Sequence, residues 1–138
     1  MLVKIQCDGS CLGNGKPDAQ AGWGISITGS VEQKFWGKVK GPQTNNRAEL
    51  WAVLKALEWL KEHKDYKAEI VSDSKLVIEG LKGIAKREAN RDIWSQIELV
   101  CPEVVDRVTD VYHVPRESNA VADKLAKRGA QALLCYCS

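Results

Sequence analysis

The hydrophobic pattern of the chain changes its period several times, and this constrains the fold more than any other feature. Short apolar or alternating runs at residues 2–8, 22–28 and 31–39 predict three successive strands, a spacing typical of an antiparallel meander. Residues 46–63 then change to a helical period. A chain that begins in this way is expected to form a mixed α/β layer once strands and helices alternate.

The rest of the chain does alternate strands with helices. Strands are predicted at residues 68–72 and 108–113, and helices at 74–81, 90–100 and 119–134. The order βββαβααβα predicts a five-stranded mixed sheet, an antiparallel meander plus parallel strands, flanked by helices. No repeat or linker separates a second domain, so we expect a single domain at residues 1–138.

Composition excludes several classes of protein. The 138 residues carry 20 Lys plus Arg against 18 Asp plus Glu, and the formal charge of +2 is too small to identify a nucleic-acid binder by itself. No apolar run approaches the roughly 20 residues that span a bilayer. The first residues lack the apolar stretch of a signal peptide, so we expect a cytoplasmic protein.

The five cysteines are odd in number and lack the paired spacing of a zinc site. They are Cys7, Cys11, Cys101, Cys135 and Cys137. We expect mostly reduced thiols, because a domain of this size needs no disulfide to fold. The alternative is that Cys135 or Cys137 pairs with a distant cysteine and holds the C-terminus.

Four carboxylates occupy unusual positions. Asp8 and Asp73 follow predicted strands, and the ligand crevice of an open α/β sheet lies beyond such strand ends. Glu49 and Asp123 lie near the starts of their helices, on the sides that should face the sheet. Ionised carboxylates are rarely buried unless they are paired or bound to metal. We therefore expect the four acids to converge at one end of the core.

Taken alone, three of these acids have simpler explanations. Asp8 fits an ordinary turn, Glu49 a capping box that begins at Asn46, and Asp73 a cap for the next helix. Four converging carboxylates favour a metal site instead, because they repel one another unless protons or metal neutralise them. All-oxygen ligands select Mg²⁺ or Mn²⁺, and two such ions could promote phosphodiester hydrolysis.

The segments that carry these acids point to one family. They are residues 8–14 (DGSCLGN), 44–49 (TNNRAE), 72–74 (SDS) and 119–126 (NAVADKLA). In this order they resemble type 1 ribonuclease H over nearly the whole chain. The resemblance implies a ribonuclease H-like fold and an endoribonuclease that hydrolyses the RNA strand of RNA/DNA hybrids. It also implies two Mg²⁺ ions, for which Mn²⁺ could substitute, and products with 5′-phosphate and 3′-hydroxyl ends.

The same resemblance assigns roles to individual residues. Asp8 would bridge both metals, Glu49 and Asp73 would help to hold one, and Asp123 the other. Substrate contacts would come from the loop after the first strand and from the residues before the glutamate, namely Gly9, Ser10, Asn14, Thr44, Asn45 and Asn46. Short amides, hydroxyls and glycine backbone suit the recognition of 2′-hydroxyls across a minor groove.

The chain departs from the family between the last strand and the last helix. Better-known members carry a histidine on a flexible loop there, which is thought to assist proton movement or product release. His113 matches either that histidine, by its ten-residue spacing from Asp123, or a strand-end histidine that many members possess in addition. We favour the second alignment, in which the loop histidine is deleted. Arg116 is then the substitute, able to hold a phosphate but not to shuttle protons.

A second departure follows the Asp73 helix. Many members insert an extra helix and a basic protrusion that grips the hybrid, whereas residues 82–91 are too short for it. We also expect no separate N-terminal hybrid-binding domain, so the chain is similar to the short archaeal and bacterial branch. Phosphate contacts would fall to basic side chains that could equally form a solvated face, namely Lys75, Lys82, Lys86, Arg87 and Arg91.

We therefore expect a monomeric enzyme that binds RNA/DNA hybrids and no membrane. The alternatives are a non-catalytic hybrid-binding module and a DNA-strand nuclease on the same fold. The intact acids argue against the first, and the lack of a partner domain argues against the second. Without the four site acids, 14 acids face 20 basic residues, a balance of +6 that suits a polyanionic substrate.

Overall fold

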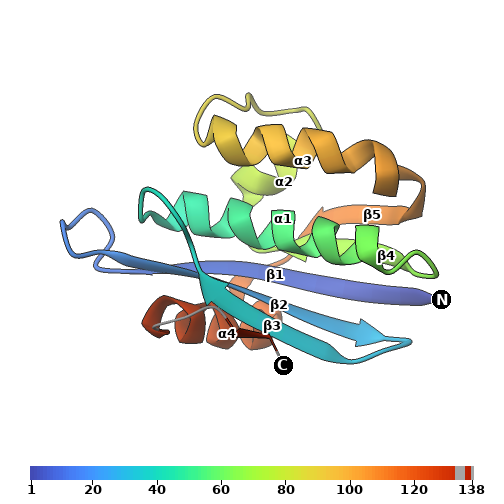
Figure 1. Cartoon of the computed structure of the whole chain (residues 1–138), viewed down its shortest axis with the longest axis horizontal. Coiled ribbons are helices and arrows are strands. Elements are labelled where there is room, and N and C mark those ends of the chain that lie inside the picture. Colours follow the sequence, from blue (N-terminus) through green and yellow to red (C-terminus); the bar gives the residue numbers. More distant parts are fainter. Residues whose placement is uncertain (133–135, 138) are drawn as a thin grey trace.

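The computed structural model describes residues 1–132 and 136–137, and it contains one mixed sheet with helices on both faces (Figure 1). The strands are β1 (Leu2–Leu12), β2 (Gln20–Gly29), β3 (Gln33–Lys38), β4 (Lys67–Ser72), β5 (Val108–His113) and β6 (Tyr136–Cys137). Their order is β5-β4-β1-β2-β3-β6, with β1, β2 and β3 antiparallel and β1, β4 and β5 parallel. This confirms the predicted mixed sheet of five strands, to which the two-residue β6 adds an antiparallel edge beside β3.

The helices divide between the two faces of the sheet. They are α1 (Asn45–Glu62), α2 (Lys75–Leu81), α3 (Arg91–Val104) and α4 (Ala120–Gln131), with 3-10 turns η1 (Val105–Arg107) and η2 (Arg116–Asn119). In Figure 1, α1 lies on one face with α3 beyond it, and α4 lies on the opposite face. Among the described residues, no helix is long and apolar enough to cross a membrane.

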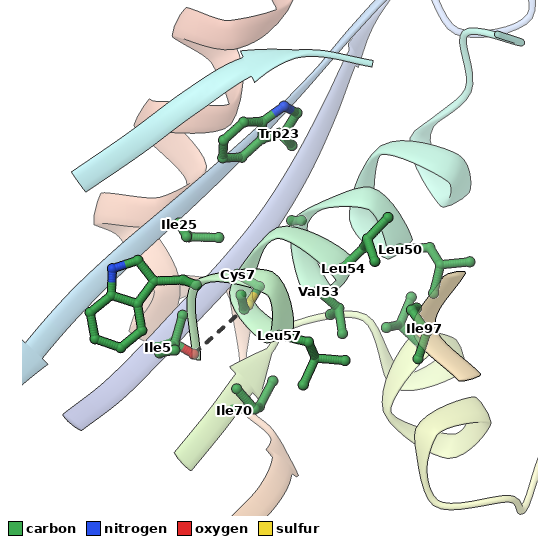
Figure 2. Close-up of a cluster of buried hydrophobic side chains, with 14 of the residues drawn as sticks. Ile5, Cys7, Trp23, Ile25, Leu50, Val53, Leu54, Leu57, Ile70 and Ile97 are labelled. Carbon is green, nitrogen blue, oxygen red and sulfur yellow. Dashed lines mark hydrogen bonds between the residues drawn. The ribbon is translucent and has the colours of Figure 1, made fainter. Parts of the chain in front are cut away.

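The main core lies between α1 and the sheet (Figure 2). The apolar side of α1 packs there against β-branched side chains of the central strands and against Ile97 of α3. Every residue of this set is at most 3% exposed: Ile5, Ile25, Leu50, Val53, Leu54, Leu57, Ile70 and Ile97. Figure 2 also shows the Cys7 thiol, which donates to the Ile5 carbonyl at 3.8 Å. This packing fixes the rotation of α1 and therefore the direction in which Glu49 points.

The opposite helix, α4, packs closely against β2 because β2 carries glycines at the contact. A Cβ atom on Gly22 would overlap the backbone nitrogen of Ala130, and one on Gly24 would overlap that of Ala126. The backbone of α4 can therefore lie directly on the strand. This close approach brings Asp123, in the first turn of α4, toward β1.

Three element boundaries differ from the prediction by three residues or more. β1 does not end at Asp8 but continues to Leu12, because residues 9–12 keep their antiparallel pairing with β2. α3 does not end at Val100 but continues through Pro102 to Val104; proline removes one backbone donor, yet Val100 and Val104 are both buried. α4 ends at Gln131, with Ala132 extended, and residues 133–134 of the predicted helix lie outside the described residues.

The described cysteines Cys7, Cys11 and Cys101 are free thiols, as expected. Cys7 is fully buried, and burial raises the pKa of its thiol well above the usual range. Cys135 and the side chain of Cys137 lie outside the described residues. A disulfide that holds the C-terminus therefore stays a prediction.

Candidate active site

Three carboxylates meet where the parallel pairing of β1 with β4 ends. Cys7 and Ser72 form the last parallel pair, so Asp8 and Asp73 follow side by side. Asp8 lies within β1, opposite Gly24 of β2, and is neither a turn residue nor the end of its strand. Asp8, Glu49 and Asp73 each offer a carboxylate oxygen within 4.8 Å of the others, which is a spacing that could hold a metal ion.

Glu49 reaches this cluster because of how α1 begins. The N-cap of α1 is Thr44, whose Oγ1 accepts a hydrogen bond from the Arg47 backbone N–H at 3.2 Å. The alternative of a capping box between Asn46 and Glu49 is therefore wrong. A Cβ atom on Gly9 would overlap the Glu49 backbone nitrogen. Because glycine lacks this atom, the first turn of α1 can pack directly on β1.

Asp73 does not cap the helix that follows it, so this alternative is also wrong. The cap of α2 is Ser74, whose Oγ accepts from the Val77 backbone N–H at 3.3 Å. Asp73 Oδ1 is instead buried with no hydrogen-bond partner among the described residues. An unsatisfied buried polar atom costs about 1–3 kcal/mol. A bound cation would supply the partner that this oxygen lacks.

Asp123 joins the group from the other face of the sheet. Its side chain is 19% exposed and lies close enough to Asp8 to raise the pKa of that acid, but it lies outside the cluster of three. Asp123 Oδ1 is 3.6 Å from Arg116 Nη2, and Oδ2 is 3.1 Å from Lys127 Nζ. Three of the four acids therefore form one cluster, and the fourth, Asp123, lies beside it and is paired with two cations.

Burial dominates the electrostatics of the site. It raises the pKa of Asp8 to about 9, helped by the neighbouring carboxyls of Asp73, Asp123 and Glu49. Burial also raises the pKa of Glu49 to about 7, against a hydrogen bond from Ser74. At Asp123 burial acts in the same direction, but Lys127, Asp8 and Arg116 outweigh it and lower the pKa. A metal-free cluster of this kind retains protons that a divalent cation would displace.

A cavity of about 430 Å³ lies over the four acids. Its lining contains Asp8, Gly9, Ser10, Cys11, Asn45, Glu49, Asp73, Arg116 and Asp123. Asn14 supports one residue of this lining, because its Oδ1 accepts a hydrogen bond from the Asn45 backbone N–H at 3.1 Å. The structure therefore places Gly9, Ser10 and Asn45, three of the predicted substrate residues, beside the carboxylates.

Comparison with known proteins agrees with this arrangement. The model of the RNase H family matches residues 2–131. The chain belongs to the ribonuclease H family. A ribonuclease H of Pseudomonas fluorescens is 33% identical in an alignment 153 residues long, and this alignment covers 97% of this chain and 95% of the relative. The helices that the structure describes in this ribonuclease H fold are too short or too polar to span a membrane.

Solved ribonuclease H structures superimpose on most of the chain. The crystal structure of LC11-RNase H1 in complex with an RNA/DNA hybrid gives a TM-score of 0.78 at 28% identity, covering 93% of this chain and 96% of that one. RNase H1 of the halophilic archaeon Halobacterium salinarum gives a TM-score of 0.73 at 27% identity, covering 94% and 97%. The resemblance of the four segments to ribonuclease H is therefore confirmed.

The remaining predicted residues lie at the edge of the ribonuclease H site or outside it. Asn46 lines a separate cavity of about 60 Å³ beside Trp94, and Lys75 is exposed at the start of α2. His113 does not line the acid cavity, and its Nε2 donates to the Asp73 backbone carbonyl at 3.1 Å. Arg116 does face the acids, which favours it over His113 as the auxiliary group.

Sequence reasoning missed Asn119 as a support of the site. Its side chain is fully buried, and Nδ2 donates to the Cys7 carbonyl at 2.8 Å. This bond ties the start of α4 to the residue that precedes Asp8. The sequence contained only a weak signal for it, since an asparagine before a helix usually indicates a cap, and Asn119 makes no cap bond here.

Arg47 was also missed, although it occupies the apolar face of α1 three residues before Leu50. It is 5% exposed and forms a two-pronged ion pair with Asp92, at 2.7 and 2.9 Å. Its Nε donates to the Lys40 carbonyl at 2.8 Å. Arg47 thus joins the start of α1 to α3 and to the preceding loop. The signal was the same as for Glu49, a charge where the helix should be apolar.

Proposed function

We propose that this chain is an endoribonuclease that hydrolyses the RNA strand of RNA/DNA hybrids by two-metal-ion phosphodiester hydrolysis, leaving 5′-phosphate and 3′-hydroxyl ends. The observation that carries the proposal is the cluster of Asp8, Glu49 and Asp73, with carboxylate oxygens within 4.8 Å, in a member of the ribonuclease H family. A relative that is similar over 93% of this chain was crystallised with an RNA/DNA hybrid.

The donor set suits Mg²⁺, with Mn²⁺ as a substitute. Every candidate ligand is a carboxylate oxygen, and the cavity is open, so a hard cation could keep waters and share substrate phosphates. The unpartnered Asp73 Oδ1 supports an ion at this place. Two ions, when bound, would supply a nucleophilic water and stabilise charge on the departing 3′-oxygen.

The arrangement of the acids supports distinct roles. The carboxyls of both Asp73 and Asp123 raise the pKa of Asp8, so Asp8 is the acid best placed to serve both metals. Glu49 and Asp73 complete the first set of ligands. Asp123 belongs to the second. The 4.8 Å cluster excludes Asp123, which supports this division.

Substrate would be held by neutral groups and one guanidinium around the cavity. Gly9, Ser10 and Asn45 present backbone and short polar groups suited to 2′-hydroxyls. Arg116 would bind a phosphate, because its guanidinium is permanently charged and donates without exchanging a proton. Residues 1–138 would act as one domain and as a monomer. Thr44, Asn46 and Lys75 would contact only flanking parts of the duplex.

A substrate panel tests the proposal. The protein is incubated with a labelled RNA/DNA hybrid, duplex DNA, duplex RNA and single strands, in Mg²⁺, in Mn²⁺ and in EDTA. We expect cleavage of the RNA strand of the hybrid alone, lost in EDTA, with fragments that a polymerase extends from their 3′-hydroxyls. Cleavage of the DNA strand would indicate a DNA nuclease instead. Binding without cleavage would indicate a hybrid-binding module.

The auxiliary group is tested by two variants. We expect Arg116→Ala to lower turnover by about tenfold or more, as for a charge-assisted phosphate contact, with a smaller effect for His113→Ala. Initial rates on the same hybrid at saturating Mg²⁺ make the comparison. Loss of turnover in His113→Ala with normal turnover in Arg116→Ala would show that the histidine alignment is the right one.

A further inference from the structure

Asp123 differs from the other three acids because a cation stands beside each of its oxygens. Arg116 Nη2 lies 3.6 Å from Oδ1, and Lys127 Nζ lies 3.1 Å from Oδ2. Within residues 1–132, no ion pair engages Asp8, Glu49 or Asp73, and Asp73 Oδ1 has no partner at all. Of the four candidate metal ligands, Asp123 is therefore the one already paired with cations of the protein.

The two ion pairs of Asp123 differ in their geometry and in the exposure of the cation. Arg116 comes from the turn η2, and its side chain is 72% exposed. Lys127 lies on α4 itself, one helical turn after Asp123, and its side chain is 50% exposed. Residues four apart are neighbours on the helix surface, so Lys127 does not depend on a separate turn to lie near Asp123. Lys127 is not among the residues that line the acid cavity, whereas Arg116 is.

We propose that Lys127 is a positioning residue that holds the Asp123 carboxylate and competes with the second divalent ion for it. The inference rests on the proposed function, because it concerns the metal ligands of that site. An ammonium and a divalent cation repel each other, so Lys127 beside Asp123 Oδ2 would weaken the binding of an ion to this carboxylate. The second ion should therefore bind more weakly than it would without Lys127, whereas the first ion should not be affected.

Counting bound Mn²⁺ on the full chain tests this without measuring activity. Free Mn²⁺ is followed by electron paramagnetic resonance during titration of the wild type, Lys127→Gln, Lys127→Arg and Lys124→Gln. Lys124 is the matched control, an exposed lysine on the same helix. We expect Lys127→Gln to tighten the second ion up to about fivefold, the upper range for an exposed ion pair, with the first ion unchanged. Lys127→Arg should behave as the wild type does.

Two results would overturn the role of Lys127: a second ion that binds Lys127→Gln and the wild type alike, or an equal gain in Lys124→Gln, which would be a general charge effect. A wild type that binds no first ion would contradict the proposed function instead. Thermal unfolding in EDTA completes the test, because Lys127→Gln removes only an exposed pair and should shift the midpoint by no more than a few degrees.

Discussion

Asp8 is 3% exposed and lies among three other acids, so its ionisation affects the stability of the metal-free protein. Its pKa is about 9 in the fold against 3.8 ordinarily, and that of Glu49 is about 7 against 4.5. Between pH 4 and 9 the folded chain therefore holds more protons than the unfolded chain. This contribution is fully present below about pH 4 and is lost as the pH rises through these raised values.

We accordingly predict that, in EDTA, the free energy of unfolding falls between pH 5 and pH 8.5 in the wild type and falls much less in Asp8→Asn. The amide cannot ionise, so the variant should be the more stable protein at pH 8.5, by at least about 3 °C in the unfolding midpoint. Thermal denaturation followed by circular dichroism measures it. An equal pH dependence in both proteins would contradict the raised pKa of Asp8.

Asn119 offers a second test at the scale of one residue. Asn119→Ala leaves the Cys7 carbonyl without its partner, which should cost about 1–3 kcal/mol of unfolding free energy and lower turnover, because α4 is no longer tied to β1. Gln6→Ala is the matched control, since Gln6 Nε2 donates to Ser118 in an exposed bond. Urea denaturation should show a smaller loss for Gln6→Ala. Equal losses would mean that burial of the bond has no special importance.

At the scale of elements, the contact of α4 with β2 depends on the missing side chain of Gly22. Gly22→Ala would force the Ala130 backbone away, and we expect a loss of about 3 kcal/mol or more. The control is Gly83→Ala, where the added atom meets open space and only the positive φ of 76° is strained, at about 1 kcal/mol. Chemical denaturation of both variants compares them. A Gly22→Ala protein as stable as the control would show that α4 packs less closely.

The elements also show what the sequence could and could not predict. Periodicity was enough to place Glu49 and Asp123 on the inner faces of their helices, because helix rotation follows from the apolar stripe. It could not identify the cap of α1, since Thr44, Asn45 and Asn46 are all good caps in succession. Thr44 accepts a hydrogen bond from the backbone N–H of Arg47, and the side chain of Arg47 is held by Asp92, which is distant in the sequence.

The full length of β1 could not be predicted from the sequence for a similar reason. Residues 9–12 contain glycine, serine and cysteine before a Gly- and Asn-rich turn, a composition typical of a loop. They extend β1 because β2 offers partners as far as Gln20, and such pairing is a long-range property. The ion pair of Lys127 with Asp123 was not predicted either, because the helical pattern assigned the two residues to different faces of α4, although they are four residues apart.

Across the whole molecule, the small net charge conceals two populations. Four acids gather around one cavity, and the rest of the chain has 20 basic residues against 14 acidic ones, a balance of +6. Two divalent ions would cancel the four carboxylates, so the loaded enzyme would meet a polyanion with its basic surface uncompensated. Metal would therefore serve both the chemistry and the approach of the hybrid.

One measurement tests the central claim most directly: turnover and hybrid binding of Asp73→Asn beside the exposed-acid control Asp106→Asn. We predict that Asp73→Asn loses cleavage in Mg²⁺ by at least about a thousandfold while it folds normally and binds the hybrid in EDTA at least as tightly as the wild type. Asp106→Asn should cleave at the normal rate. Retained turnover of Asp73→Asn in Mg²⁺ would contradict the assignment of these carboxylates as metal ligands.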